Sequence, residues 1–104
     1  MRRLREPEHY RRALKAERRA GNWFVVYAAP NSGVGSRLGI VIARRVAPRA
    51  VDRSALRRLI REAFRQCPER GQPLDVVVRL ARLPRPSDRR GVAAEICSLF
   101  ERIL

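Results

Sequence analysis

The most regular pattern of apolar and polar positions lies between residues 53 and 65. Placed on a helix at about 100° per residue, its apolar side chains gather on one side and its arginines on roughly the opposite side. This pattern predicts an amphipathic helix that packs one face on a core and presents a stripe of guanidinium groups on the other. The apolar positions are Leu56, Leu59, Ile60 and Ala63, and the arginines are Arg57, Arg58, Arg61 and Arg65.

The residues before this helix predict a shorter helix followed by two strands. Pro7 suits a first helical position, and apolar residues then recur at helical spacing up to a stop near Gly21. Residues 23–29 and 37–46 have the alternation and the branched and aromatic residues of strands, with a glycine-containing turn between them. Together these two segments predict an antiparallel hairpin.

The residues after the arginine-rich helix predict one more strand and one more helix. Residues 74–81 form a nearly continuous apolar run, which is typical of a central strand buried on both sides. From Val92 to Ile103 the apolar residues recur at helical spacing. The order is therefore α-β-β-α-β-α over residues 1–104, which predicts a single α+β domain, a two-layer sandwich with helices on one side of a small sheet. The other face of the sheet is expected to be open to a ligand.

Charge is the strongest compositional signal. The 104 residues include 24 Lys and Arg against 10 Asp and Glu, a net charge of +14, and Lys15 is the only lysine. Arginine grips phosphate with a planar fork and stacks on bases, so this balance favours a nucleic-acid partner, RNA in particular. A solvated helix face, with arginine chosen through genomic base composition, is the plainer alternative for the stripe.

Catalytic and metal-binding patterns are sparse. His9 is the only histidine, the carboxylates are scattered singly, and Cys67 and Cys97 have neither a metal-ligand nor a CxxC spacing. We expect Cys97 to fill the core. No catalytic residue and no protein-bound metal is predicted. No apolar run approaches the ~20 residues of a membrane span and no secretory signal is recognisable, so a cytoplasmic location is expected.

Several segments, in this order, resemble the protein subunit of bacterial ribonuclease P. Tyr10 and Leu14 resemble two positions of the family's first helix, and residues 24–27 and 74–78 resemble two of its strands. One departure lies at Arg53-Ser54-Ala55, where the family normally has Arg-Asn-Arg, so an amide and a guanidinium are missing here. The central matching segments are RLGIVIARR at 37–45, RAVDR at 49–53 and LRRLIREAF at 56–64.

The resemblance implies an accessory subunit of an endoribonuclease whose active site lies in its RNA. That RNA would cut precursor tRNA at the mature 5′ end, with Mg²⁺ bound by the RNA subunit or by the substrate. The result would be tRNA 5′ maturation by a particle with one protein for each RNA. The resemblance also implies the ribosomal protein S5 domain 2-like fold with an unusual left-handed β-α-β crossover, although such units are right-handed in ~98% of proteins.

The resemblance implies two sets of site residues as well. In the family the arginine helix docks on the catalytic RNA, while the sheet and first helix form a cleft for the single-stranded 5′ leader. Phe24 and Tyr27 point to opposite faces of a strand, so only one of them faces the cleft, and we favour Tyr27. The RNA-subunit set is Arg53, Ser54, Arg57, Arg58, Arg61 and Arg65; the leader set is Tyr10, Leu14, Phe24, Tyr27, Arg44 and Arg45.

Two rival interpretations stay open at this point. A small ribosomal or other structural RNA-binding protein would share the basic surface and lack a substrate cleft. An autonomous nuclease would have to use His9 and would cut RNA without an RNA subunit.

Overall fold

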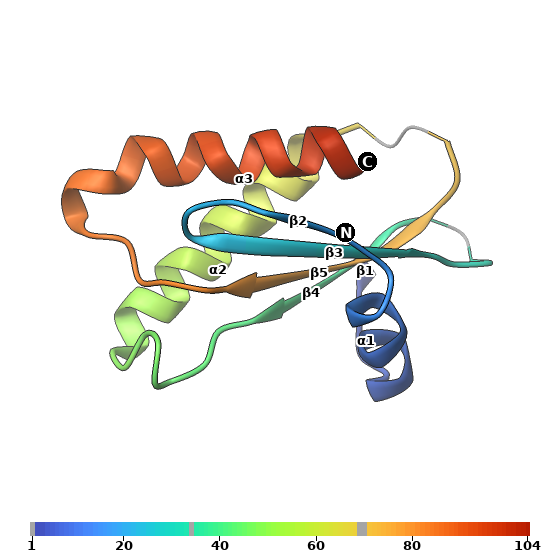
Figure 1. The fold of residues 1–104 in the computed structure, drawn as a ribbon, viewed down its shortest axis with the longest axis horizontal. Coiled ribbons are helices and arrows are strands. Elements are labelled where there is room, and N and C mark those ends of the chain that lie inside the picture. The colour runs from blue at the N-terminus through green and yellow to red at the C-terminus, as the bar shows by residue number, and fades with distance from the viewer. Residues whose placement is uncertain (1, 34, 69–70) are drawn as a thin grey trace.

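A computed structural model describes residues 2–33, 35–68 and 71–104 (Figure 1). The predicted order of three helices and three strands is confirmed, with two further short strands, β1 and β2. No helix in the described ranges combines the length and the apolar character needed to cross a membrane. The elements are β1 (Arg2–Arg3), α1 (Pro7–Leu14), β2 (Glu17–Ala20), β3 (Phe24–Pro30), β4 (Arg37–Val41), α2 (Ala50–Gln66), β5 (Leu74–Leu80), a 3-10 turn (Pro86–Asp88) and α3 (Arg89–Ile103).

The five strands form one mixed sheet in the order β1-β4-β5-β3-β2. Strand β5 is central, as predicted, and pairs parallel with β4 and antiparallel with β3. The predicted hairpin of residues 23–29 with residues 37–46 is therefore wrong, because β5 lies between the two strands. Helix α2 carries the chain from β4 across to β5, and such a crossover makes two strands parallel. A turn that connects two strands in the sequence does not show that those two strands pair with each other in the sheet.

The first helix is shorter than predicted. It ends at Leu14, and Glu17–Ala20, expected to be helical, forms the edge strand β2 along β3. The apolar positions that favour a helix stop at Leu14, and all four residues of β2 are exposed. Because exposed charged side chains suit a helix surface and an edge strand equally well, the free edge of β3 decides the conformation by supplying backbone partners.

Strand β4 is also shorter than predicted and ends at Val41. Arg44 and Arg45 lie in the turn that follows, where the backbone N–H groups of Val46 and Ala47 both donate to the carbonyl of Ala43 at 3.0 Å. The prediction that the strand extends through Arg44 and Arg45 to residue 46 is therefore wrong. Both side chains are exposed beyond the end of the sheet.

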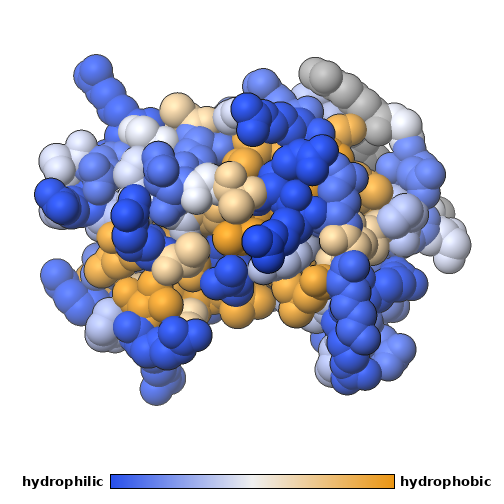
Figure 2. Space-filling view, in the orientation of Figure 1, coloured by the Kyte–Doolittle hydropathy of each residue, from blue (hydrophilic) through white to orange (hydrophobic). Residues whose placement is uncertain are grey.

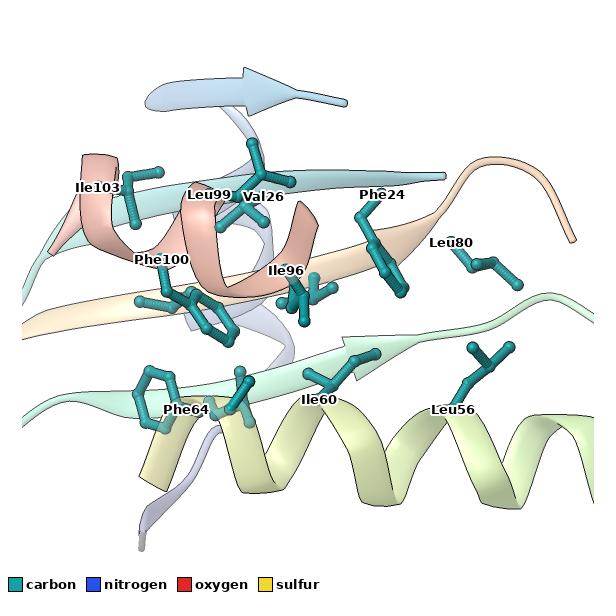
Figure 3. Close-up of a cluster of buried hydrophobic side chains, with 14 of the residues drawn as sticks. Phe24, Val26, Leu56, Ile60, Phe64, Leu80, Ile96, Leu99, Phe100 and Ile103 are labelled. Atoms are coloured by element: carbon teal, nitrogen blue, oxygen red, sulfur yellow. The ribbon is translucent and has the colours of Figure 1, made fainter. Parts of the chain in front are cut away.

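The main core lies between the sheet and the two long helices, α2 and α3 (Figure 3). Phe24, Ile60, Ile96 and Phe100 are fully buried in it. The rings of Phe64 and Phe100 meet edge to face with their centroids 5.4 Å apart, so the two helices also pack on each other. Cys97, expected in this core, is instead exposed on α3.

A smaller cluster lies on the opposite face of the sheet, beneath α1. It joins Ala13 of α1 to Leu4, Tyr27 and Val77, with Tyr10 packed against it. Figure 1 shows α3 above the sheet and α1 below it. The face that the sequence analysis expected to be open is thus covered at one end by α1 and exposed beyond it.

Glu95 of α3 fastens the start of β3 to the helix layer. Its carboxylate accepts hydrogen bonds from three successive backbone N–H groups, those of Asn22, Trp23 and Phe24, at 2.6, 2.8 and 2.9 Å. A Cβ on Gly21 would lie 2.3 Å from the Glu95 carboxyl carbon, so glycine at this position lets the carboxylate approach the chain.

We expect Glu95→Ala to lower the free energy of unfolding by about 2–3 kcal/mol, because three backbone donors lose a charged acceptor. Chemical denaturation measures this change. Glu101→Ala removes an exposed carboxylate from the same helix and serves as the control. Equal losses in the two variants would show that the three hydrogen bonds contribute nothing specific to folding.

Candidate RNA interface

Three arginines of α2 form a cationic stripe that nothing in the described chain neutralises. Arg58 is exposed, and Arg57 and Arg61 are half-buried at the edge of the helix. Among residues 2–33, 35–68 and 71–104, none of the three makes an ion pair or a side-chain hydrogen bond. The stripe borders a shallow depression of about 410 Å³, which is lined by Ser54, Arg57, Arg58, Arg61, Glu62 and Arg65.

The two arginines at the ends of the predicted set are engaged within the protein. The Arg53 guanidinium donates to the carbonyls of Ala47 and Pro48, both at 2.9 Å, and so holds the loop that leads into α2. Arg65 pairs with Glu62 at 2.5 Å, and its hydrogen bond lowers the pKa of Glu62 below the usual range. Within α2, the charge available to an anionic partner is therefore concentrated on Arg57, Arg58 and Arg61.

Tyr27 and Phe24 lie on opposite faces of β3, as the strand alternation requires. Phe24 is fully buried against α2 and α3, so it has no surface on which a base could stack. Tyr27 faces the α1 side but is only 7% exposed. Its hydroxyl accepts a hydrogen bond from Nε of Arg79 at 3.3 Å. Tyr27 therefore places its hydroxyl beside Arg79 on this face and offers little aromatic surface.

Arg79 is a site residue that the sequence analysis missed. In the register of the sheet it lies between Val25 of β3 and Val41 of β4. Because cross-strand partners share a face, these side chains stand on the α1 side of the sheet, where Val41 is 37% exposed. The sequence of β5 could have predicted this residue. Strand alternation places Asp75 and Arg79 on the same face, and two charged residues on one face indicate that it is not completely covered by apolar side chains.

Tyr10 brings the leader set and the RNA-subunit set together. Its hydroxyl donates to the carbonyl of Leu4 at 3.1 Å, and its ring lies so close to β4 that a Cβ on Gly39 would be 2.6 Å from two ring carbons. A depression of about 400 Å³, which we name the seam pocket, joins this ring to the stripe. It is lined by Arg3, Leu4, Arg5, Tyr10, Leu38, Gly39, Ile40, Arg57 and Arg61.

The other members of the leader set lie around the same face or beyond its edge. Leu14 ends α1 with 43% of its surface exposed. Arg44 and Arg45 are exposed in the turn after β4. Four guanidinium groups and one aromatic ring thus surround the seam pocket. Arg79 and the turn arginines add positive charge on or near this face of the sheet, and Leu14 adds exposed apolar surface.

A buried carboxylate holds α1 in place above the sheet. Asp75, fully buried on the central strand, accepts hydrogen bonds from Arg37 at 2.8 Å on each oxygen, from Arg12 of α1 at 2.9 Å and from Asn31 at 2.9 Å. Burial alone would raise the pKa of Asp75, but these donors outweigh it and lower that pKa below the usual range. Asp75 therefore stays ionised and ties α1 to β4 and β5.

The described residues contain no cluster of three or more His, Cys, Asp or Glu side chains that could hold a metal ion. His9 is half-buried on α1. The arrangement consists of cations, one aromatic ring and apolar strand surface. Such a surface binds a polyanion and positions it, through charge and stacking.

Comparisons with known proteins give one consistent family. The ribonuclease P protein component of Bordetella petrii is 41% identical over 111 aligned positions, which cover 97% of this chain and 90% of that protein. The ribonuclease P protein component of Aromatoleum aromaticum is 35% identical, covering 96% of this chain and 85% of that protein. The alternative of a small ribosomal or structural RNA-binding protein receives no support from these similarities.

Solved structures show the same fold. The RNase P protein of Staphylococcus aureus superposes with a TM-score of 0.71 at 25% identity, covering 99% of this chain and 92% of that one. The RNase P protein of Thermotoga maritima gives a TM-score of 0.69 at 25% identity, covering 100% and 96%. The family model for ribonuclease P matches residues 1–104. On the strength of sequence and fold together, the chain belongs to the ribonuclease P protein family.

Proposed function

We propose that this protein is the accessory subunit of a cytoplasmic ribonuclease P, in which one protein binds one catalytic RNA and the 5′ leader of precursor tRNA. The RNA subunit holds the Mg²⁺ ions and cuts the precursor tRNA. The protein binds and orients the substrate. The observation that carries this proposal is the arginine stripe, which has no acidic partner in the described chain and of which Arg57 and Arg61 line one pocket together with Tyr10 of α1.

The arginine stripe is the contact with the RNA subunit. Like charges on successive turns of a helix repel, so Arg57 and Arg61 destabilise the free protein unless an anion lies against them. Phosphates of a folded RNA supply that anion, and each contact releases condensed counterions. The shallow depression along α2 leaves the three guanidinium groups accessible to such a backbone.

The leader lies on the face of the sheet beside α1. An unpaired strand needs cations for its phosphates and flat or apolar surface for its bases. Arg79 and the turn arginines Arg44 and Arg45 supply the first, and Leu14 and Val41 are exposed for the second. Because the seam pocket borders both surfaces, a leader bound there meets the RNA subunit on α2.

The physical contribution to catalysis is positioning. Holding two polyanions in one geometry removes translational freedom before the chemical step. Protein cations next to the RNA also replace part of the counterion charge, so weaker or fewer Mg²⁺ ions suffice. The requirement for Mg²⁺ should therefore fall when the protein is present.

Reconstitution tests this function. At low Mg²⁺, the protein should restore leader removal by the ribonuclease P RNA of the same organism, while the protein alone should leave precursor tRNA intact. Absence of rescue would favour a different RNA partner. Cleavage by protein free of RNA, abolished by His9→Ala, would instead show an autonomous nuclease.

Arg79→Met should weaken binding of precursor tRNA to the holoenzyme by about tenfold, or 1.4 kcal/mol, and should leave mature tRNA unaffected. Methionine keeps the apolar stem that packs beside Val25 and removes only the charge. Equilibrium binding of matched precursor and mature tRNA measures the ratio, with Arg102→Ala on α3 as a control for lost charge. If the variant lost affinity for precursor and mature tRNA equally, Arg79 would not be part of the surface that binds the leader.

A further inference from the structure

A third depression lies on the other flank of α2, away from the seam pocket. It has a volume of about 430 Å³ and separates the first half of α2 from the segment that leads into α3. None of the predicted RNA-binding residues lines it. We name it the 55–89 groove, and its lining is Arg49, Asp52, Ala55, Leu56, Leu59, Leu83, Pro84, Arg85, Pro86, Arg89 and Val92.

The groove combines an apolar floor with a cationic rim. Leu59, Leu83 and Pro84 supply apolar surface, and Leu83 is 37% exposed although it is a large hydrophobic side chain. Figure 2 shows apolar surface beside projecting hydrophilic side chains at the end of the molecule where α2 begins. The rim holds three exposed arginines against a single carboxylate, and these residues are Arg49, Arg85, Arg89 and Asp52.

The small side chain of Ala55 keeps the groove open. Ala55 is exposed on α2 and forms part of the lining, so a longer side chain at this position would extend into the space. Arg85 and Arg89 reach the same space from the opposite wall. Two of the three cations next to this flank of α2 are therefore supplied by the segment before α3 and by the first residue of α3, and the third is Arg49 at the start of α2.

We propose that the 55–89 groove binds an unpaired nucleotide of the RNA subunit, with its base against the apolar floor and its flanking phosphates on the arginine rim. This inference rests on the proposed function, because it extends the contact between α2 and that RNA. It assigns RNA contacts to Arg49, Arg85 and Arg89, which lie outside the stripe.

Charge and continuity favour RNA over a protein partner. The rim arginines have no carboxylate partner within residues 2–33, 35–68 and 71–104, and the whole chain carries a net charge of +14. A nucleotide strand brings one phosphate per residue together with a planar base, which matches several guanidinium groups around one apolar floor. Ala55 and Arg58 are neighbours at i and i+3 on α2, so the groove adjoins the stripe.

Salt dependence tests the rim. For the variant Arg85→Ala/Arg89→Ala, the plot of log K against log salt for the RNA subunit should be less steep by about 1.4, or 0.7 per lost single-strand contact. Arg102→Ala, which removes one exposed cation from the far end of α3, should leave the slope unchanged. Asp52→Asn should tighten binding, because it removes the one repelling carboxylate of the groove. Thermal unfolding confirms that each variant is folded.

The stripe variant Arg57→Ala/Arg61→Ala distinguishes a failure of the groove proposal from a failure of the proposed function. If it flattens the slope while Arg85→Ala/Arg89→Ala does not, the groove is not an RNA contact and the proposed function stands. If wild-type protein shows no binding to the RNA subunit at all, the proposed function itself fails.

A photo-crosslinker identifies the occupant. With p-benzoylphenylalanine at position 83 in the reconstituted holoenzyme, we expect a crosslink to an unpaired nucleotide of the RNA subunit. A crosslink to a base-paired segment, to a second copy of this chain or to no RNA at all would overturn the assignment.

Discussion

Replacing Asp75 by asparagine should lower the free energy of unfolding by about 3 kcal/mol, the largest stability loss that we expect from a single change in charge. Removal of one partner from a buried ion pair costs about 3–5 kcal/mol, because the other charge is left uncompensated. Here the cost falls at the lower end, because the side chains of Arg12 and Arg37 are 52% and 25% exposed and can turn to water. Urea denaturation measures the change.

The same substitution should also change the response to acid. The folded-state pKa of Asp75 lies below its ordinary value. Its stabilising effect is therefore complete above the unfolded-state pKa, near pH 4, and is lost as the pH falls through the lower folded-state pKa. Wild-type protein should lose stability over this acid range, and the asparagine variant should lack that part of the loss.

Two controls separate Asp75 from ordinary surface charge. Glu8→Gln breaks the exposed pair with Arg11 and should cost less than about 1 kcal/mol. Arg12→Ala removes only the α1 arm of the cluster, so it should loosen α1 and weaken precursor tRNA binding while most of the stability persists. If Asp75→Asn and Glu8→Gln had equal effects, Asp75 would not be the link that holds α1 on the sheet.

The periodicity of apolar residues predicted which segments form helices and strands much better than it predicted which strands pair with each other. The apolar stripe of α2 and the continuous apolar run of β5 each define a burial pattern, so their helix and strand were predicted correctly. Sheet order depends on which strand edges are free after the helices pack, and no local pattern encodes that. The predicted hairpin failed for this reason, as did the helical assignment of Glu17–Ala20.

The candidate site shows the same division. The arginines of α2 could be found from helical spacing, because their exposure follows from the burial of Leu56 and Ile60 on the other side of the helix. The engagement of Arg53 with loop carbonyls could not, since it depends on the path of the chain before α2. The seam pocket likewise depends on the parallel pairing of β1 with β4.

The stripe variant Arg57→Ala/Arg61→Ala should weaken binding to the RNA subunit by on the order of 100-fold, or tenfold for each arginine. Both side chains line the seam pocket, and neither has an acidic partner in the described chain, so the free protein loses no ion pair and should stay folded. Equilibrium binding over a series of salt concentrations measures the effect, and the slope of log K against log salt should fall by about 1.8.

Lysine at the same two positions distinguishes charge from geometry. Arg57→Lys/Arg61→Lys keeps both cations, so the salt slope should match that of wild type, while affinity should fall partway because an ammonium group cannot grip phosphate with two parallel hydrogen bonds. Arg102→Ala should leave both quantities near wild type. If the slope of log K against log salt were unchanged in the alanine variant, Arg57 and Arg61 would belong to an ordinary solvated helix face. The RNA subunit would then have to bind elsewhere on the protein.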